Sequence, residues 1–251
     1  MIRCLDFNAD LGEGGDDQSL MPWLSSASIA CGFHAGDPAR MRDTVALCLQ
    51  HGVAIGAHPS FDDRANFGRT EHPITPADAH ALVSYQIGAL AGMARAAGAR
   101  LAHVKPHGAL YNQAARDPAL ADAIAAAVRD ADPGLRLFGL AASELTAAGE
   151  RLGLAVAHEV FAERRYDANG QLAPRGSPGA VIDTVEHSLA QVRQLLGEGA
   201  VTARTGERVA LRADTLCLHG DRPDAAAFAR ALREALDADG VQVRAPGRGD
   251  E

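Results

Sequence analysis

The sequence predicts a single α/β domain, a distorted (β/α) barrel of about seven parallel strands. Short apolar runs alternate with longer, alanine-rich amphipathic runs along the chain. Strands that alternate with helices pair in parallel through right-handed crossovers. The 251 residues are 47% hydrophobic and show no change of composition halfway, which fits one large core better than two small ones. A doubly wound open sheet is the alternative.

The predicted strands are short apolar runs bounded by Gly, Pro, Asp or Asn. They cover residues 4–8, 28–33, 53–58, 100–106, 135–141, 154–162 and 214–220. We expect the barrel domain to cover residues 1–244. Residues 245–251 are rich in Gly, Pro and charge, and we expect them to form a disordered tail.

Two of the helices have both ends marked in the sequence. The first covers residues 37–52, where Asp-Pro provides an N-cap and a first helical residue, and a glycine ends the helix. The second covers residues 75–98 and repeats this plan with Thr-Pro at its start and a glycine at its end. Helices of this kind provide the crossovers between parallel strands.

Composition limits the classes of partner. The formal net charge is -8, and the Lys and Arg residues are scattered, which argues against a nucleic-acid-binding protein. The four cysteines have no CxxC spacing and lie in apolar stretches, as expected of buried thiols in a reducing cytoplasm. No leader sequence is visible and no apolar run approaches ~18 residues, so we expect a cytoplasmic protein with no membrane span.

Polar side chains collect where the predicted strands end. Along the chain they are Asn8, Asp10, His34, His58, His107, Glu159, Glu163, His219 and Asp221. The carboxyl ends of the strands form the active face of α/β barrels. One such His or Glu is often only a hydrogen-bonded or solvated residue, but here the pattern recurs at most of the strand ends. We therefore predict one shared site.

The segment "HVKPHGALYN" adds a lysine to this site. His103, Lys105 and His107 alternate along it, and alternate residues of a strand point to the same face. The spacing predicts that the three side chains stand in a row on one side of the strand.

Long motifs in the chain resemble those of a known family. In order from residue 8 to residue 221 they read "NADLGE", "ACGFHAGDP", "GAHPS", "NFGR", "YQIGAL", "HVKPHGALYN", "EVFAERRY", "LAPRGSPGAV" and "CLHGD". By these motifs the chain resembles the LamB/YcsF family, the A subunits of bacterial ATP-dependent 5-oxoprolinases. The resemblance covers nearly the whole chain.

The resemblance implies a hydrolase subunit. Its reaction would convert 5-oxo-L-proline to L-glutamate, with ATP as co-substrate, in the company of separate B and C subunits. It also implies a fold similar to the glycoside hydrolase/deacetylase barrels, in agreement with the strand count.

The chain departs from the family's pattern at three places. The loop "GEGGDDQSLMP" after the first strand is shorter than usual, which puts its substrate contacts in doubt. Ser28 replaces an amide side chain with a hydroxyl. Glu163 replaces the usual aspartate, so its carboxylate lies one methylene further out.

Opening a lactam needs an activated water, stabilisation of the oxyanion and a proton for the leaving nitrogen. Asp10, Glu159 and Asp221 are the candidates for the base, and Lys105 and His107 are the candidates for stabilising the oxyanion. A purely structural Lys105, ion-paired to Asp10 or Glu159, is the alternative.

Binding of the substrate carboxylate requires two hydrogen-bond donors held side by side, as in a guanidinium group. Arg164 and Arg175 are the main candidates and Arg69 is a weaker one, although each could equally be a solvated or ion-paired arginine. The other predicted substrate-binding residues are Asn8, His34, His58 and His219.

ATP and metal are separate questions. The chain has no GxxxxGK[ST], so we expect ATP to be handled with the partner subunits. Asp10, His34, His58 and His219 are ligand types that suit zinc. Lys105 would repel a cation, however, so we expect no tightly bound metal.

Two other function classes remain open. One is a stand-alone metal-dependent deacetylase or amidohydrolase that acts on a sugar or a small amide. The other is a non-catalytic subunit that holds a small acidic ligand for a partner enzyme.

Overall fold

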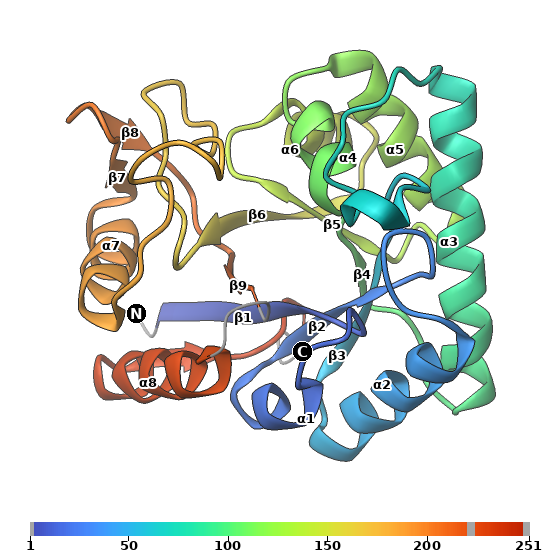
Figure 1. Ribbon diagram of the computed structural model, residues 1–251, viewed down its shortest axis with the longest axis horizontal. Coiled ribbons are helices and arrows are strands. Elements are labelled where there is room, and N and C mark those ends of the chain that lie inside the picture. Colours follow the sequence, from blue (N-terminus) through green and yellow to red (C-terminus); the bar gives the residue numbers. More distant parts are fainter. Residues whose placement is uncertain (1–2, 220–223, 248–251) are drawn as a thin grey trace.

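Seven parallel strands close into a barrel in the computed structural model, which describes residues 3–219 and 224–247 (Figure 1). The barrel strands are β1 (Arg3–Leu11), β2 (Ser26–Ala30), β3 (Ala54–His58), β4 (His103–Val104), β5 (Arg136–Leu140), β6 (Ala155–Phe161) and β9 (Thr215–Leu218). Each strand pairs with the next along this series, and β1 pairs with β9 to complete the ring. The predicted barrel is therefore confirmed, and the open doubly wound sheet is excluded.

Helices surround the barrel and connect its strands. They are α1 (Asp17–Leu20), α2 (Pro38–His51), α3 (Pro76–Ala96), α4 (Gly108–Ala114), α5 (Pro118–Ala131), α6 (Glu144–Arg151), α7 (Val185–Glu198) and α8 (Ala225–Ala238), with single 3-10 turns η1 (Met21–Trp23) and η2 (Arg64–Asn66). The two helices with predicted boundaries are α2 and α3. The Asp37 and Thr75 side chains cap them, each accepting a hydrogen bond from a backbone N–H in the first turn.

Three predicted strands were wrong in extent. The strand predicted over 4–8 is β1, which continues to Leu11 and includes Asp10. The strand predicted over 28–33 is β2 and ends at Ala30, because Gly32 turns the chain with a φ of +94°. The strand predicted over 100–106 is reduced to the two residues of β4. Pro106 has no N–H to donate to a strand ladder, which helps to end the strand before the chain enters α4.

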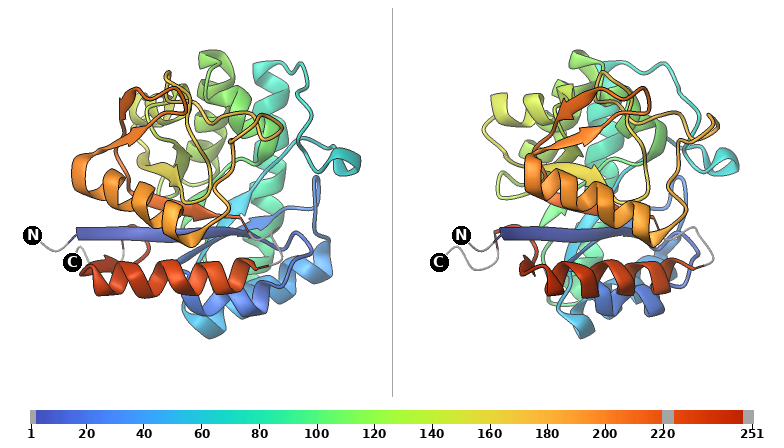
Figure 2. Two further views of the ribbon diagram at one scale, coloured as in Figure 1. Left: turned by 60° about the vertical axis from the view of Figure 1, so that its left-hand side comes forward. Right: turned by 90° about the vertical axis from the view of Figure 1, so that its left-hand side faces the viewer.

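Three short strands were not predicted. The antiparallel pair β7 (Ala200–Thr202) and β8 (Arg208–Ala210) lies in the long connection between β6 and β9. The strand β10 (Val241–Val243) pairs in parallel with the first residues of β1, outside the ring. Figure 2 shows α7 and α8 close to β1 at this side of the barrel.

The interior of the barrel is polar, whereas the space between strands and helices is apolar and forms one cluster. The buried interior side chains include Asp6, Asn8, Ser26, Ser28, His103, Lys105, Glu159 and Thr215. The imidazole of His103 fills the middle of the barrel, stacked on Phe138 with ring centroids 4.1 Å apart. A Cβ at Gly56 would lie 2.1 Å from that imidazole, so the neighbouring strand β3 must carry a glycine there.

The carboxylate of Asp6 lies deeper in the same polar interior. It accepts hydrogen bonds from the hydroxyls of Ser25, Ser26 and Thr215. Burial nevertheless dominates, and it raises the pKa of Asp6 to about 6. Above that pH the fold therefore holds a buried negative charge at Asp6.

The predicted tail is described only at its start. Ala245 is buried, and residues 248–251 lie outside the described residues. Among the described helices, none has both the length and the hydropathy needed to cross a bilayer.

Candidate active site

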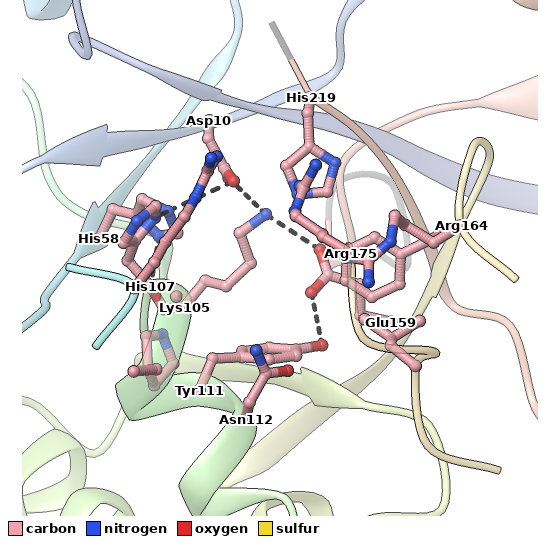
Figure 3. Close-up of a pocket in the computed structure, with 16 residues that line it drawn as sticks. Asp10, His58, Lys105, His107, Tyr111, Asn112, Glu159, Arg164, Arg175 and His219 are labelled. Carbon is pink, nitrogen blue, oxygen red and sulfur yellow. Dashed lines mark hydrogen bonds and ion pairs between the residues drawn. The ribbon is translucent and has the colours of Figure 1, made fainter. Parts of the chain in front are cut away.

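A cavity of about 230 Å³ opens at the carboxyl ends of the barrel strands (Figure 3). The strand-end side chains that border it come from different parts of the sequence, because the carboxyl ends of the parallel strands lie together at one rim of the barrel. The polar residues of its lining are Asp10, His58, Arg69, Lys105, His107, Tyr111, Asn112, Glu159, Arg164, Arg175 and His219. Phe161 and Leu172 supply apolar lining.

Lys105 is the centre of the charged network in this cavity. Its Nζ lies 2.6 Å from Asp10 Oδ1 and 3.0 Å from Glu159 Oε1, and it donates to Asn8 Oδ1 at 2.8 Å. All four side chains are buried. The ammonium is held by two carboxylates, which raises the pKa of Lys105 well above its usual value despite its burial.

Both carboxylate oxygens of Glu159 accept hydrogen bonds. Its Oε1 accepts from Lys105 and from Asn8 Nδ2, and its Oε2 accepts from Tyr111 Oη at 2.7 Å. Burial and the charge of Glu159 raise the pKa of Tyr111, which keeps this hydroxyl protonated as a donor. These contacts suit a carboxylate that positions Lys105 and Tyr111 better than one that takes a proton from water.

Asp10 is held as an anion. Burial favours the neutral acid, but the nearby charges of His58 and Lys105 lower the pKa of Asp10 well below its usual value. Its Oδ2 lies 3.4 Å from His58 Nε2. A carboxylate with such a low pKa is a weak base and a strong electrostatic partner.

His58 and His107 are oriented by backbone carbonyls. His58 Nδ1 donates to the carbonyl oxygen of Lys105 at 2.7 Å, and His107 Nε2 donates to that of Phe67 at 2.9 Å. Their other ring nitrogens, His58 Nε2 and His107 Nδ1, face one another at 2.9 Å. Burial, followed by the neighbouring charge of His58, holds the pKa of His107 well below its usual range.

Glu13 joins this histidine pair from the loop after β1. Its Oε1 lies 2.8 Å from His34 Nε2, 3.3 Å from His107 Nδ1 and 3.7 Å from His58 Nε2. Burial and the negative charge of Asp10 raise the pKa of Glu13 to about 7. Burial is also the main cause that lowers the pKa of His34 to about 2, so this imidazole is neutral.

His219 and Glu163 form a second pair on the opposite side of the cavity. Glu163 Oε1 accepts a hydrogen bond from His219 Nδ1 and lies behind His219 rather than in the lining. The longer side chain at position 163 therefore serves to hold an imidazole. With Nδ1 bound, Nε2 is the ring nitrogen of His219 left for the cavity.

Arginines gather at the rim of the cavity. The Arg164 side chain is buried, and its Nη2 donates to the carbonyl oxygen of Ala173, while its Nε has no hydrogen-bond partner among the described residues. Burial and the charge of Arg175 lower the pKa of Arg164 to about 10. Arg69 stacks its guanidinium 4.9 Å from the centre of the Phe67 ring. Two guanidiniums that repel one another at a rim favour an anionic ligand.

Most of the residues predicted for a shared site do converge. Asn8 and His34 lie directly behind the lining, where they contact Glu159 and Glu13 respectively. Asp221 lies outside the described residues. Of the four candidate metal ligands, His34 and His58 lie beside Glu13, and Asp10 borders His58. Asp10 and His219 also lie close enough to share an ion, although His219 is bound to Glu163.

The predicted row of His103, Lys105 and His107 lies on the interior side of the barrel, and only Lys105 and His107 reach the cavity. His103 points into the barrel below the cavity, where Ser28 Oγ lies 3.2 Å from its Nε2, and it is absent from the lining. Sequence reasoning missed Glu13, Tyr111 and Asn112. Glu13 stands three residues after Asp10 in "NADLGE", and Tyr111 lies one helical turn after His107. These spacings could have identified both residues as members of the site.

Comparisons with known proteins support one family over the whole chain. A model of the LamB/YcsF family matches residues 5–249. A protein of Bordetella pertussis, named as the A subunit of a 5-oxoprolinase, is 54% identical over 251 residues, which cover 98% of this chain and 100% of that protein.

Solved structures agree with this assignment. The crystal structure of a lactam utilization protein from Thermus thermophilus is similar with a TM-score of 0.91 and 48% identity, covering 96% of this chain and 99% of that chain. A family 4 carbohydrate esterase from Streptomyces lividans is similar with a TM-score of 0.51 and 13% identity, covering 96% of this chain and 91% of that chain. The esterase shares the fold alone.

Proposed function

The chain belongs to the LamB/YcsF family, and on this premise we propose that it is the A subunit of an ATP-dependent 5-oxoprolinase. The reaction hydrolyses the lactam of 5-oxo-L-proline to L-glutamate while ATP is hydrolysed to ADP and phosphate. Separate B and C subunits take part. The observation that carries the proposal is the full-length match to a relative that is named for this activity.

The cavity supports a small anionic ring as substrate. Its volume of about 230 Å³ fits a single small ring better than a sugar chain. In this proposal Arg164 and Arg175 bind the substrate carboxylate, and the unpartnered Nε of Arg164 is a donor available for it. Phe161 and Leu172 would contact the apolar edge of the ring.

In this proposal, different charged groups of the cavity take part in different steps of the reaction. Lys105 and His107 border the cavity where the lactam carbonyl would develop negative charge, and Lys105 carries a fixed positive charge there. His219, held by Glu163, is our candidate for moving the proton between water and the leaving nitrogen. Asp10 and Glu159 keep Lys105 in place rather than acting as bases.

ATP enters this scheme through the partners. The chain has no GxxxxGK[ST], and its "GEGG" segment is acidic, which does not suit a phosphate-cradling loop. We propose that the B and C subunits help to convert the lactam oxygen to a phosphorylated form, and that this chain completes the hydrolysis.

Reconstitution tests the proposal. The chain is mixed with purified B and C subunits, 5-oxo-L-proline and ATP, and glutamate and ADP are measured together. We expect glutamate only when all three proteins and ATP are present. Hydrolysis of an N-acetylated sugar by the chain alone, without glutamate formation in the full mixture, would favour the deacetylase alternative.

A histidine variant separates catalysis from simple ligand holding. His219→Asn should lower the turnover of the reconstituted enzyme by a factor on the order of 10² or more, as expected for loss of a general acid-base group. His80→Asn is the matched control, because His80 lies on the surface and contacts Asp130. Unchanged turnover in His219→Asn would point to a role for this histidine outside the chemical step.

A further inference from the structure

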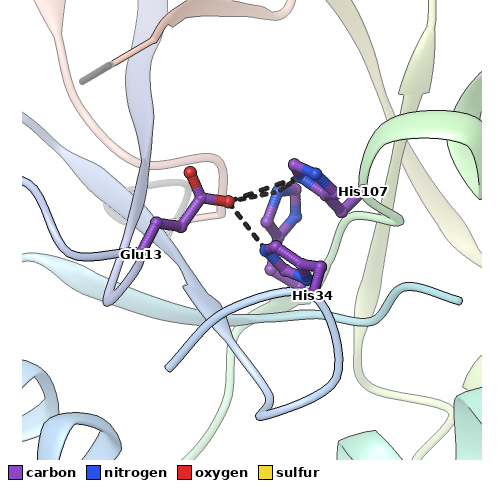
Figure 4. A group of neighbouring side chains, drawn as sticks. Glu13, His34 and His107 are labelled. Atoms are coloured by element: carbon purple, nitrogen blue, oxygen red, sulfur yellow. Dashed lines mark hydrogen bonds and ion pairs between the residues drawn. The ribbon is translucent and has the colours of Figure 1, made fainter. Parts of the chain in front are cut away.

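We propose that Glu13, His58 and His107 form a binding site for one divalent transition-metal ion of the Zn²⁺ type. The site lies at the side of the cavity where two histidines of the lining meet the loop after β1 (Figure 4). The inference concerns binding alone. It stands whether or not the proposed lactam hydrolysis is correct.

The donor atoms have the spacing of ligands to one ion. His58 Nε2 and His107 Nδ1 are 2.9 Å apart, and Glu13 Oε1 lies 3.3 Å from His107 Nδ1 and 3.7 Å from His58 Nε2. Two ligand atoms ~2.1 Å from a metal and at right angles are about 3.0 Å apart, and wider angles give larger separations. All three distances therefore fit a common ion with small adjustments of the side chains.

The tautomers of the two histidines favour a cation between them. Each ring already donates its N–H to a backbone carbonyl, His58 from Nδ1 and His107 from Nε2. With these N–H groups bound, His58 Nε2 and His107 Nδ1 point toward one another at 2.9 Å, where both can act as ligands to one cation. This is also how metal-ligating histidines are commonly oriented, with the second nitrogen bound to a carbonyl.

The charge balance of the cluster answers the objection that Lys105 repels a cation. Asp10, Glu13 and Glu159 supply three negative charges when ionised, and Lys105 supplies one positive charge that Asp10 and Glu159 already share. Glu13 instead faces the imidazoles of His34, His58 and His107. A divalent ion bound there would pair with the Glu13 carboxylate, and Lys105 would stay bound to its own two carboxylates.

His34 acts behind this site as a positioning residue. Its Nε2 lies 2.8 Å from Glu13 Oε1, and its ring is stacked on that of His107 with centroids 3.8 Å apart. An imidazole that donates to the carboxylate and packs on a ligand ring would hold both in the binding geometry. Groups of this kind typically change metal affinity by about 10- to 100-fold when they are removed.

Calorimetric titration of the metal-stripped chain with Zn²⁺ tests the proposal in the absence of substrate and partner subunits. We expect one equivalent to bind. Glu13→Gln and His107→Gln should each weaken binding by about 100-fold or more, and His34→Asn by about 10- to 100-fold. His80→Asn, a surface histidine, should bind as the unmodified chain does.

Thermal melting of the same samples shows whether each variant folds and whether Zn²⁺ stabilises it. We expect Zn²⁺ to raise the melting temperature of the unmodified chain and of His80→Asn, but not that of Glu13→Gln. Equal Zn²⁺ affinity in the unmodified chain and in Glu13→Gln and His107→Gln would overturn the proposal, as would the absence of stoichiometric binding. Neither result would contradict the proposed lactam hydrolysis, which the reconstitution assay measures separately.

Discussion

Lys105 lines the cavity and also has its ammonium between two buried carboxylates, Asp10 and Glu159. The change Lys105→Met keeps most of the stem volume and strands those carboxylates. We expect it to lower the free energy of unfolding by about 3–5 kcal/mol, because breaking a buried ion pair leaves uncompensated charge. Turnover of the reconstituted enzyme should also fall by a factor on the order of 10².

Melting and turnover are to be measured on one preparation of Lys105→Met. Turnover per folded molecule distinguishes the two roles. A loss of stability with full turnover per folded molecule would limit Lys105 to a structural role, and a loss of turnover without destabilisation would mean that the ion pairs contribute little to the fold.

Asp6 predicts a pH dependence of stability. Its pKa is about 6 in the folded chain and 3.8 in an unfolded one, so between these values the folded state binds more protons and the free energy of unfolding falls as pH rises. Above pH 6 the full penalty is present, about 3 kcal/mol. The free energy of unfolding of Asp6→Asn should lack this pH-dependent contribution.

Denaturant unfolding of both proteins at several pH values checks this prediction. The stability of the unmodified chain relative to Asp6→Asn should decrease from pH 4 to pH 6 and then stay constant. A difference that does not change over this range would mean that the hydroxyls of Ser25, Ser26 and Thr215 compensate the buried charge completely.

At residue scale, the sequence predicted the members of the site better than their partners. His58, Lys105 and His107 were placed in the cavity because strand ends meet at one rim. The bond between Glu163 and His219 joins residues that are 56 positions apart, and no local pattern encodes such a pair. The same holds for the hydrogen bond from Asn8 to Glu159.

At the scale of elements, the turn from β4 into α4 depends on a glycine. Gly108 has a φ of +56°, and a Cβ there would lie 2.5 Å from the carbonyl oxygen of Gly68. Gly108→Ala should destabilise the chain by about 2 kcal/mol or more, through backbone strain and this clash. It should also reduce turnover, because His107 directly precedes the turn.

Gly88→Ala is the control for this substitution. Gly88 lies in α3 at an exposed position, and a Cβ there meets nothing within 4 Å. We expect it to raise the free energy of unfolding by about 0.5–1 kcal/mol. If both changes lower the stability equally, the strain assigned to Gly108 is wrong.

The elements that could be predicted were those with strong local signals. The starts of α2 and α3 carry an N-cap followed by proline, which act within one turn. By contrast, β4 has two residues and β10 has three, too few for a hydrophobic period to be read. Such short strands exist because their neighbours in the sheet hold them.

At the scale of the whole molecule, the barrel could be predicted from the number and order of its strands. Its polar interior could not, since Asp6, Asn8 and Thr215 come together only when β1 pairs with β9. That contact joins the two ends of the barrel series and brings residues more than 200 positions apart into register.

The dependence on partner subunits is a prediction about the whole molecule. Because no ATP-binding motif is visible, the isolated chain should show little or no ATP-driven conversion of 5-oxo-L-proline. Measurement of ADP release with and without the B and C subunits checks this. Robust ATP hydrolysis by the chain alone would place the nucleotide site in this subunit.

Lys105 is the only lysine of the chain, its side chain is 3% exposed, and proline follows it. Amine-reactive reagents should therefore leave Lys105 unmodified while the protein is folded. The rate of slow acylation of Lys105, measured by mass spectrometry, would then report how often the centre of the barrel opens to solvent. Chemistry directed at amines would therefore leave the cavity of the folded protein chemically intact.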